Sequence, residues 1–282
     1  ICFFLECFYR SYFSKMIVMR YPYSDIFSAI ICPIIGKKLI FEHHGKELKG
    51  PKISKSIIRK NIERIFRYFT ESRSIKRICV TQDVSNYQSL FSKLDTFVYP
   101  NPILKNNLKS TVDWHRDSYK YDLCFVSSRF RPWHGLDIAL NIFSNLSERS
   151  FLLIGKIDNI EKYNFSDNIH YIDFVNPEEL PKYYSLSKLG VASFAHSDFG
   201  YSESSSLKTR DYLSNGLKVL LTVKDPFIDT KLKEHLYICK PNYEQIDECI
   251  SSISNYSKNK VIKDYQDVCH DYIDSLGMYL NK

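Results

Sequence analysis

The stretch "SLKTRDYLSNGLKVLLTV", residues 206 to 223, contains a helical pattern, a glycine and then a continuous apolar run. A helix is predicted over 206–216 because Gly216 provides a typical C-terminal stop. A buried strand is predicted over 217–223 because this run is short, apolar and bounded by turn signals. A helix followed directly by a buried strand is the repeating element of α/β proteins.

The same alternation extends outward from this stretch in both directions. The predicted strands include 15–22, 37–45, 96–103, 121–129, 150–156, 169–175, 189–195 and 217–223. Helical patterns separate most of them, with short connections, which predicts parallel sheets. The polar stretch 104–120 has no clear period and is typical of a linker. We therefore expect two α/β units, one on each side of it.

The composition excludes several classes of protein. The chain has 282 residues, of which 44% are hydrophobic and 25% are charged, as in ordinary soluble globular proteins. The first segment, "ICFFLECFYRSYF", is too short and too interrupted by charge to span a bilayer. The net charge of +7 favours an anionic partner such as a nucleotide, a phosphate or an anionic membrane.

The eight cysteines include no CxxC pair and no Cys/His group with zinc spacing. Several, such as Cys79 and Cys124, lie in apolar strand-like runs. Buried reduced thiols are therefore expected, and these indicate a reducing compartment.

The segment that precedes the opening stretch concentrates polar chemistry. Glu203 is followed by three serines, then Lys208, Arg210 and Asp211. A helix start offers unpaired backbone N–H groups to a phosphate, and Lys208 and Arg210 would add positive charge. A carboxylate can accept hydrogen bonds from a pair of sugar hydroxyls. The alternative is a capped surface helix with mixed charges.

The pattern E-x7-D followed by "YLSNGLKVLLT" resembles the E-x7-E region of group 1 (family four) retaining glycosyltransferases of the GT-B type. The resemblance implies that Glu203 is a catalytic residue that holds sugar hydroxyls, and that Asp211 holds the ribose. It also implies that Lys208 and the amides of Ser205 and Ser206 hold the diphosphate of the donor. Asp211 stands where the family has a longer Glu.

Two further stretches fit the same family. "FVSSRFRPWHGLDIALNIF" (125–143) resembles its strand, G-R, K-G and helix sequence, so Arg129 and His134 are expected at the diphosphate. His134 replaces the Lys and would be a weaker, pH-dependent cation. The alternative is that His134 only caps the helix. The other stretch, "IHYIDFVNPEELPKYYSLSKLGVASFAHSDFGYSESS" (169–205), also fits the family, and by this resemblance the backbone near Phe174 and Val175 is expected to face the nucleobase.

His44 in "LIFEHHGKEL" (39–48) resembles a family histidine that lies near the acceptor and the transferred sugar. It is predicted to be catalytic, since a histidine can polarise or hydrogen-bond a reacting sugar. A structural role and a metal site with His43 remain alternatives. No third metal ligand is evident, and no metal site is predicted.

The segment 52–77 has nine Lys/Arg and two Glu, with Ile58, Ile62, Ile65 and Phe69 at helical spacing. The apolar stripe is expected to face the core. The basic face is expected either to be solvated or to lie on an anionic membrane, as in membrane-associated members of the resembled family.

By resemblance, the fold class is α/β of the GT-B type, with two Rossmann-like domains facing a cleft. The predicted domains are a partial acceptor-side domain at 1–105, a donor domain at 106–262 and a helix at 263–282 that crosses back. The N-terminal domain is expected to be incomplete, because the opening strand and Gly-rich loop of the family are absent.

The predicted function is transfer of a sugar from a nucleotide diphosphate sugar to a glycan or lipid-linked acceptor, in cell-surface polysaccharide synthesis. No cofactor and no nucleic-acid partner are expected. The predicted location is the cytoplasm, including the inner face of the membrane. The alternatives are an inactive GT-B remnant that binds a nucleotide or partner without catalysis, and a GT-B-type sugar-nucleotide epimerase or hydrolase.

Overall fold

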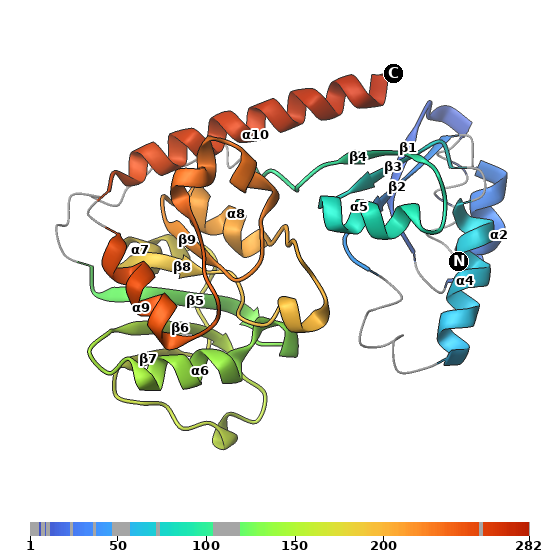
Figure 1. Cartoon of the computed structure of the whole chain (residues 1–282). Helices are drawn as coiled ribbons and strands as arrows, with labels where there is room; N and C mark the ends of the chain where they lie inside the picture. Colours follow the sequence, from blue (N-terminus) through green and yellow to red (C-terminus); the bar gives the residue numbers. More distant parts are fainter. Residues whose placement is uncertain are drawn as a thin grey trace. The chain divides into compact units, whose positions relative to one another are not determined.

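The computed structural model describes Glu6, Tyr9 and the ranges 12–22, 25–35, 38–46, 57–71, 74–103, 119–253 and 256–281. The chain divides into two compact units, Ile1–Pro100 with Met278–Lys282, and Asn101–Gly277 (Figure 1). Most of the predicted linker, 104–118, lies outside the described residues.

The first unit contains a four-stranded parallel sheet in the order β1-β2-β3-β4. Its elements are β1 (Ile17–Arg20), α2 (Ile26–Ile35), β2 (Leu39–His43), α4 (Ile57–Glu71), β3 (Lys76–Cys79), α5 (Gln82–Ser89) and β4 (Asp95–Val98). Thr81 caps α5 by accepting a hydrogen bond from the Val84 backbone at 3.1 Å. Tyr279 from the last residues of the chain stacks on Phe97 of β4, with ring centroids 4.8 Å apart.

The second unit contains a six-stranded parallel sheet in the order β10-β9-β8-β5-β6-β7. Its strands are β5 (Tyr121–Arg129), β6 (Phe151–Lys156), β7 (Ile169–Ile172), β8 (Ser187–Val191), β9 (Lys218–Leu221) and β10 (Leu236–Ile238). The chain starts in the centre at β5, moves outward to β7, returns to β8 and moves outward on the other side. This is the Rossmann order, and it places a topological switch point between β5 and β8.

Helices cover both faces of this sheet. They are α6 (Leu136–Asn145), α7 (Leu180–Ser185), α8 (Leu207–Ser214), α9 (Tyr243–Ser252) and α10 (Lys258–Asn281), with 3₁₀ turns η3 (Pro132–His134), η4 (Ile160–Lys162), η5 (Ser197–Phe199), η6 (Pro226–Asp229) and η7 (Lys231–His235). Cys124 and Val126 of β5 pack with α7, α8 and α10 in one core, whereas Leu123 and Phe125 pack with α6 and α9 in the other. Alternate side chains of β5 thus pack into two different buried cores, one on each face of the sheet.

The α/β fold with parallel sheets is therefore confirmed, while several boundaries differ from the prediction. The predicted strand 189–195 corresponds to β8, which ends at Val191. The opening stretch forms α8 and β9, with Gly216 between them at φ 79°. The short strand β10 was not predicted. Among the helices described, none has both the length and the apolar character needed to cross a membrane.

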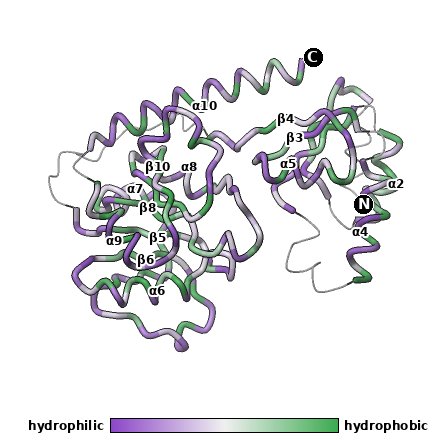
Figure 2. Tube along the Cα trace, in the orientation of Figure 1, coloured by the Kyte–Doolittle hydropathy of each residue, from purple (hydrophilic) through white to green (hydrophobic). Residues whose placement is uncertain are grey.

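The apolar stripe of helix α4 was expected to face the core, and the structure shows that it does not. Ile58, Ile62, Ile65 and Phe69 are exposed, together with Ile57. Figure 2 shows hydrophobic and hydrophilic residues alternating along this helix. The part of the predicted segment at 52–56 and 72–73 lies outside the described residues.

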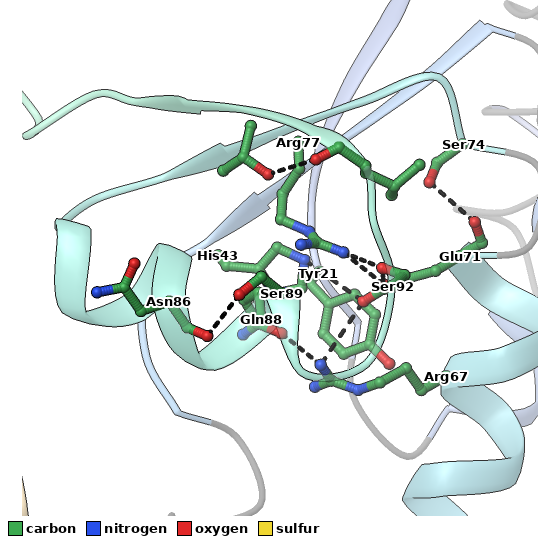
Figure 3. Close-up of polar contacts among 12 residues, drawn as sticks. Tyr21, His43, Arg67, Glu71, Ser74, Arg77, Asn86, Gln88, Ser89 and Ser92 are labelled. Carbon is green, nitrogen blue, oxygen red and sulfur yellow. Dashed lines mark hydrogen bonds and ion pairs between the residues drawn. The ribbon is translucent and has the colours of Figure 1, made fainter.

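The face of α4 that is buried carries charged side chains instead. It contributes Glu63, Arg67 and Glu71 to a buried polar cluster, which we define as these residues with Tyr21, His43, Arg77, Gln88 and the half-buried Ser92. Figure 3 shows its members other than Glu63. The Arg77 guanidinium donates to Glu71 Oε2 at 2.9 Å, and the Ser92 hydroxyl donates to the same oxygen at 2.7 Å. The Tyr21 hydroxyl donates to Glu63 at 2.9 Å. The polar side of α4 is thus buried because its charges have partners there.

Candidate active site

The switch point of the second sheet brings two loops together. One follows β5 and contains His134, and the other follows β8 and contains Ser193 and Phe194. The Phe194 backbone N–H donates to the His134 carbonyl at 2.9 Å, and the Ser193 hydroxyl donates to the Trp133 carbonyl at 2.7 Å. Ligands of open α/β sheets bind at this position, beyond the carboxyl ends of the strands.

Gly135 permits this close approach. It ends η3 and begins α6 with a φ of 73°, in the left-handed region that favours glycine. A Cβ atom at this position would lie 3.0 Å from Ala195 N and from Phe194 Cβ. A side chain here would therefore strain the backbone and push the two loops apart.

His134 is neutral at the switch point. Its Nδ1 accepts a hydrogen bond from the Arg131 backbone N–H at 3.1 Å and lies 3.3 Å from the Ser127 hydroxyl. Burial first, and then Lys208, His196 and Arg131, lower the pKa of His134 to about 3. His134 is therefore not the pH-dependent cation that the sequence predicted. With Nδ1 as an acceptor, the neutral ring carries its proton on Nε2, where it can donate to a ligand.

Lys208 and His196 are electrostatically coupled to His134. Lys208 lies in the first turn of α8, and its ammonium donates to the Ala192 carbonyl at 3.4 Å. Burial lowers the pKa of Lys208 to about 7. Burial and Lys208 lower the pKa of His196 to about 4. Lys208 therefore makes protonation of both histidines less favourable.

We call His134, His196 and Lys208 the basic cluster. The charged neighbours that lower the pKa values of His134 and His196, namely Lys208, His196 and Arg131, are themselves basic, whereas burial alone lowers the pKa of Lys208. An anion bound among them would offset this repulsion and satisfy their donors. The sequence reasoning found His134 and Lys208 but missed His196. Its position just after a central strand could have indicated it.

Glu203 and Asp211 lie in different local settings. Glu203 pairs with Lys224 in an isolated parallel bridge, where the Ser204 N–H donates to the Lys224 carbonyl at 2.9 Å. Asp211 lies on α8, where its Oδ2 accepts a hydrogen bond from the Tyr184 hydroxyl at 2.5 Å. Both carboxylates are half-buried. The first acid thus belongs to an extended segment and the second to a helix that packs against α7.

The serines and Arg210 build the start of α8. The Ser206 hydroxyl caps the helix by accepting from the Lys208 N–H at 3.3 Å. Arg210 is fully buried and donates twice to Asp225, at 3.0 and 2.8 Å, and once to the Ser205 hydroxyl, at 2.9 Å. Arg210 therefore adds no net positive charge to a ligand site, because the Asp225 carboxylate neutralises it. This corrects the expectation from sequence.

The remaining predicted donor residues lie at strand ends of the second unit. Arg129 ends β5 and pairs with Asp158 at 3.2 Å, at the surface. Phe174 and Val175 follow β7. The Phe174 side chain is 70% exposed, whereas Val175 is buried in the α8-side core.

His44 belongs to the first unit, directly after β2. Its Nε2 lies 3.0 Å from Glu42 Oε2, and the hydrogen bond from His44 is the largest cause that lowers the pKa of Glu42. His43 points elsewhere and stacks on Tyr21, with centroids 4.6 Å apart. In the part of the chain that the structure describes, no three His, Cys, Asp or Glu side chains are grouped to hold a metal ion.

A cavity of about 780 Å³ opens at the carboxyl ends of β9 and β10. Its lining comprises Ser197, Tyr201, Ser202, Thr222, Val223, Lys224, Ile228, Asp229, Thr230, Lys233 and Ile238. Ser202 and Lys224 are immediate neighbours of Glu203 in sequence and in the bridge. Hydroxyl, ammonium and carboxylate groups around one aromatic ring suit a polyhydroxylated ligand.

Comparison with known proteins defines the class of fold. No protein-family model matches the chain, and no curated protein matches it. Among solved structures, HepE from Anabaena in complex with UDP has a TM-score of 0.67 at 11% identity, over 99% of this chain and 81% of that one. Sucrose-phosphate synthase from Thermosynechococcus elongatus has a TM-score of 0.62 at 12% identity, over 98% and 75%.

A glycosyltransferase from Rickettsia africae is similar in the same way, with a TM-score of 0.56 at 14% identity, over 96% of this chain and 74% of that one. These likenesses establish the fold. The chain has a Rossmann-like GT-B fold, as the sequence predicted.

Proposed function

We propose that this chain is a retaining glycosyltransferase. It would move a sugar from a nucleotide diphosphate sugar to a glycan or lipid-linked acceptor, in cell-surface polysaccharide synthesis. The observation that carries the proposal is the basic cluster at the switch point, where His134, His196 and Lys208 gather beside the start of α8. HepE, which has the same fold, was solved with UDP.

The proposed donor lies along the carboxyl edge of the second sheet. Lys208, the His134 Nε2–H, Arg129 and the amides of Ser205 and Ser206 would hold the diphosphate. Asp211 would accept from the ribose hydroxyls. The backbone at Phe174 and Val175 would face the nucleobase.

In the reaction, the bond between the sugar C1 and the diphosphate oxygen breaks. A bond from C1 to the acceptor oxygen forms on the same face, and the proton of the acceptor hydroxyl passes to the leaving diphosphate oxygen. Negative charge grows on the leaving diphosphate, where the basic cluster can stabilise it. Glu203 would hold the sugar hydroxyls, and His44 would hydrogen-bond the reacting sugar.

We propose that this reaction needs no bound metal, because basic side chains and a helix start neutralise the leaving group. Transfer should then persist undiminished in excess EDTA. A loss of transfer in EDTA that Mg²⁺ or Mn²⁺ restores would contradict this part of the proposal.

Titration calorimetry with UDP-, GDP- and ADP-sugars tests the donor site. Saturable binding of one nucleotide class is expected, and Glu203→Ala or Asp211→Ala should weaken it. Lys218→Met is a control, because Lys218 is the first residue of β9 and so lies at the amino ends of the strands, away from the proposed site. Its ammonium donates to the Tyr237 hydroxyl at 2.8 Å. A folded wild type that binds none of the three donors would refute the proposal.

Turnover separates the proposed enzyme from its alternatives. Product formation that requires an added glycan acceptor, with the anomeric configuration of the donor kept, is expected. Donor binding without turnover would favour the inactive remnant. Conversion or hydrolysis of the donor without an acceptor would favour an epimerase or hydrolase.

We also propose that α4 meets an anionic membrane surface on the cytoplasmic side. The support is its exposed apolar row, in which Ile58 is 72% exposed, together with the exposed basic residue Arg64. Flotation should show binding to phosphatidylglycerol vesicles above phosphatidylcholine vesicles, and Ile58→Asp with Ile65→Asp should abolish it. Leu90→Asp is the control, since Leu90 is 77% exposed beyond α4. Equal flotation of both variants would refute this surface.

A further inference from the structure

Asp211 is contacted by a tyrosine from a neighbouring helix. The Tyr184 hydroxyl of α7 donates to Asp211 Oδ2 at 2.5 Å, whereas Asn215 Nδ2 lies 3.5 Å from Oδ1. Tyr184 is only 2% exposed, while the Asp211 side chain is half-buried. The tyrosine therefore reaches the carboxylate from the protein interior.

The position of Tyr184 is fixed on several sides. Its ring packs edge-on against Tyr212, with centroids 5.3 Å apart. Its backbone carbonyl accepts from the Lys258 ammonium of α10 at 2.9 Å. Burial first, and then the Asp211 charge, raise the pKa of Tyr184 far above its ordinary value. The phenol therefore stays protonated and acts as a donor to the carboxylate.

We propose that Tyr184 is a positioning residue, which orients Asp211 to accept hydrogen bonds from both ribose hydroxyls and so makes the site select ribonucleotides over deoxyribonucleotides. The inference rests on the proposed function. One carboxylate oxygen is anchored from inside, so less side-chain entropy is lost when a ligand binds outside.

A purely structural role for the same contact makes a different prediction. In that case the hydroxyl would only link α7 to α8, and its removal would lower stability alone. Tyr212 provides the matched control. Tyr212 is also fully buried. Its hydroxyl accepts from the Val126 N–H of β5 at 3.0 Å and donates to the Val191 carbonyl of β8 at 3.2 Å, so it does not contact Asp211 in this way.

The experiment is a cycle of protein and ligand changes. Calorimetry measures the affinity of the wild type, Tyr184→Phe, Tyr212→Phe and Asp211→Asn for UDP, GDP and ADP and for their 2′,3′-dideoxy analogues. The wild type is expected to prefer the ribo form of the base that it binds. Tyr184→Phe should reduce that preference by about three- to tenfold, the worth of one hydrogen bond. Tyr212→Phe should leave the preference unchanged even if its melting temperature falls.

The outcomes separate this inference from the function on which it rests. Binding without any ribo preference, or a preference that Tyr184→Phe preserves, overturns the role of Tyr184 while the donor site stands. A wild type that binds none of the nucleotides overturns the proposed function and this inference with it. Should Tyr184→Phe not fold, Asp211→Asn must still lose the ribo preference, and its retention overturns the inference.

Discussion

The buried polar cluster of the first unit and the basic cluster of the second both gather titratable side chains, but only the first contains acidic and basic groups together. In the first, Arg67 pairs with Glu63 at 3.6 Å. Arg77 pairs with Glu71 at 2.9 Å (Figure 3). In the second, the charged neighbours that lower the pKa values of His134 and His196 are all basic. Balanced buried charges satisfy one another and support the fold, whereas unbalanced ones favour an anionic ligand.

Removing one partner from the balanced cluster should have the largest effect. Glu71→Ala leaves the Arg77 guanidinium buried without its carboxylate, since both residues are almost fully buried. The free energy of unfolding should fall by about 3–5 kcal/mol. Urea denaturation measures this. A loss below about 1 kcal/mol would mean that the balanced charges of this cluster do not stabilise the fold.

Removing a member of the unbalanced cluster should affect binding instead. Lys208→Met should weaken donor binding by about 10- to 100-fold, the worth of a charge-assisted hydrogen bond. Its stability should be maintained, because the buried ammonium is unfavourable in the empty site. Calorimetry and urea denaturation on the same variant decide this. A variant with lowered stability and normal donor affinity would show that Lys208 supports the fold and does not bind the donor.

The pH dependence should sharpen the same contrast. Because the pKa of Lys208 is about 7 in the folded protein, against 10.5 ordinarily, the folded state holds fewer protons between these values. The free energy of unfolding should therefore rise with pH over this window, and the full cost of the buried charge is present below pH 7.

Donor affinity should move the opposite way, falling by up to about tenfold per pH unit above 7, because binding an anion requires the protonated amine. Both slopes should vanish in Lys208→Met, which leaves no ammonium at this position. Calorimetry with a nucleotide sugar, whose diphosphate has no group that titrates near neutral pH, measures the affinity. A slope that persists in the variant would assign the proton to another group.

The smallest effect on stability is expected at Arg129. Its pair with Asp158 is exposed, so Arg129→Met should change the free energy of unfolding by less than about 1 kcal/mol. Donor affinity should nevertheless fall, because Arg129 is proposed to hold the diphosphate. Asp158→Asn, which removes the other partner, is the control and should not weaken binding. Equal affinity in both variants would remove Arg129 from the site.

The sequence by itself determined the α/β class, the order of most elements and the segments that carry polar chemistry. Alternating buried strands and capped helices are local patterns, so 206–223 predicted α8 and β9 to within a few residues. His134 and Lys208 were named from the motifs of the resembled family, and their roles remain proposals. The roles of Glu203, Asp211 and His44 remain proposals.

Only the tertiary structure decided which charges have partners. Lys208 and Arg210 are two residues apart on one helix. Arg210 pairs with Asp225 in the core, whereas Lys208 belongs to the basic cluster with His134 and His196. The helical spacing of the apolar residues in α4 likewise did not predict that they are exposed. Spacing identifies which residues share a face of a helix, but not what that face packs against. Burial and pairing depend on residues far apart in the chain, and only folding brings these together.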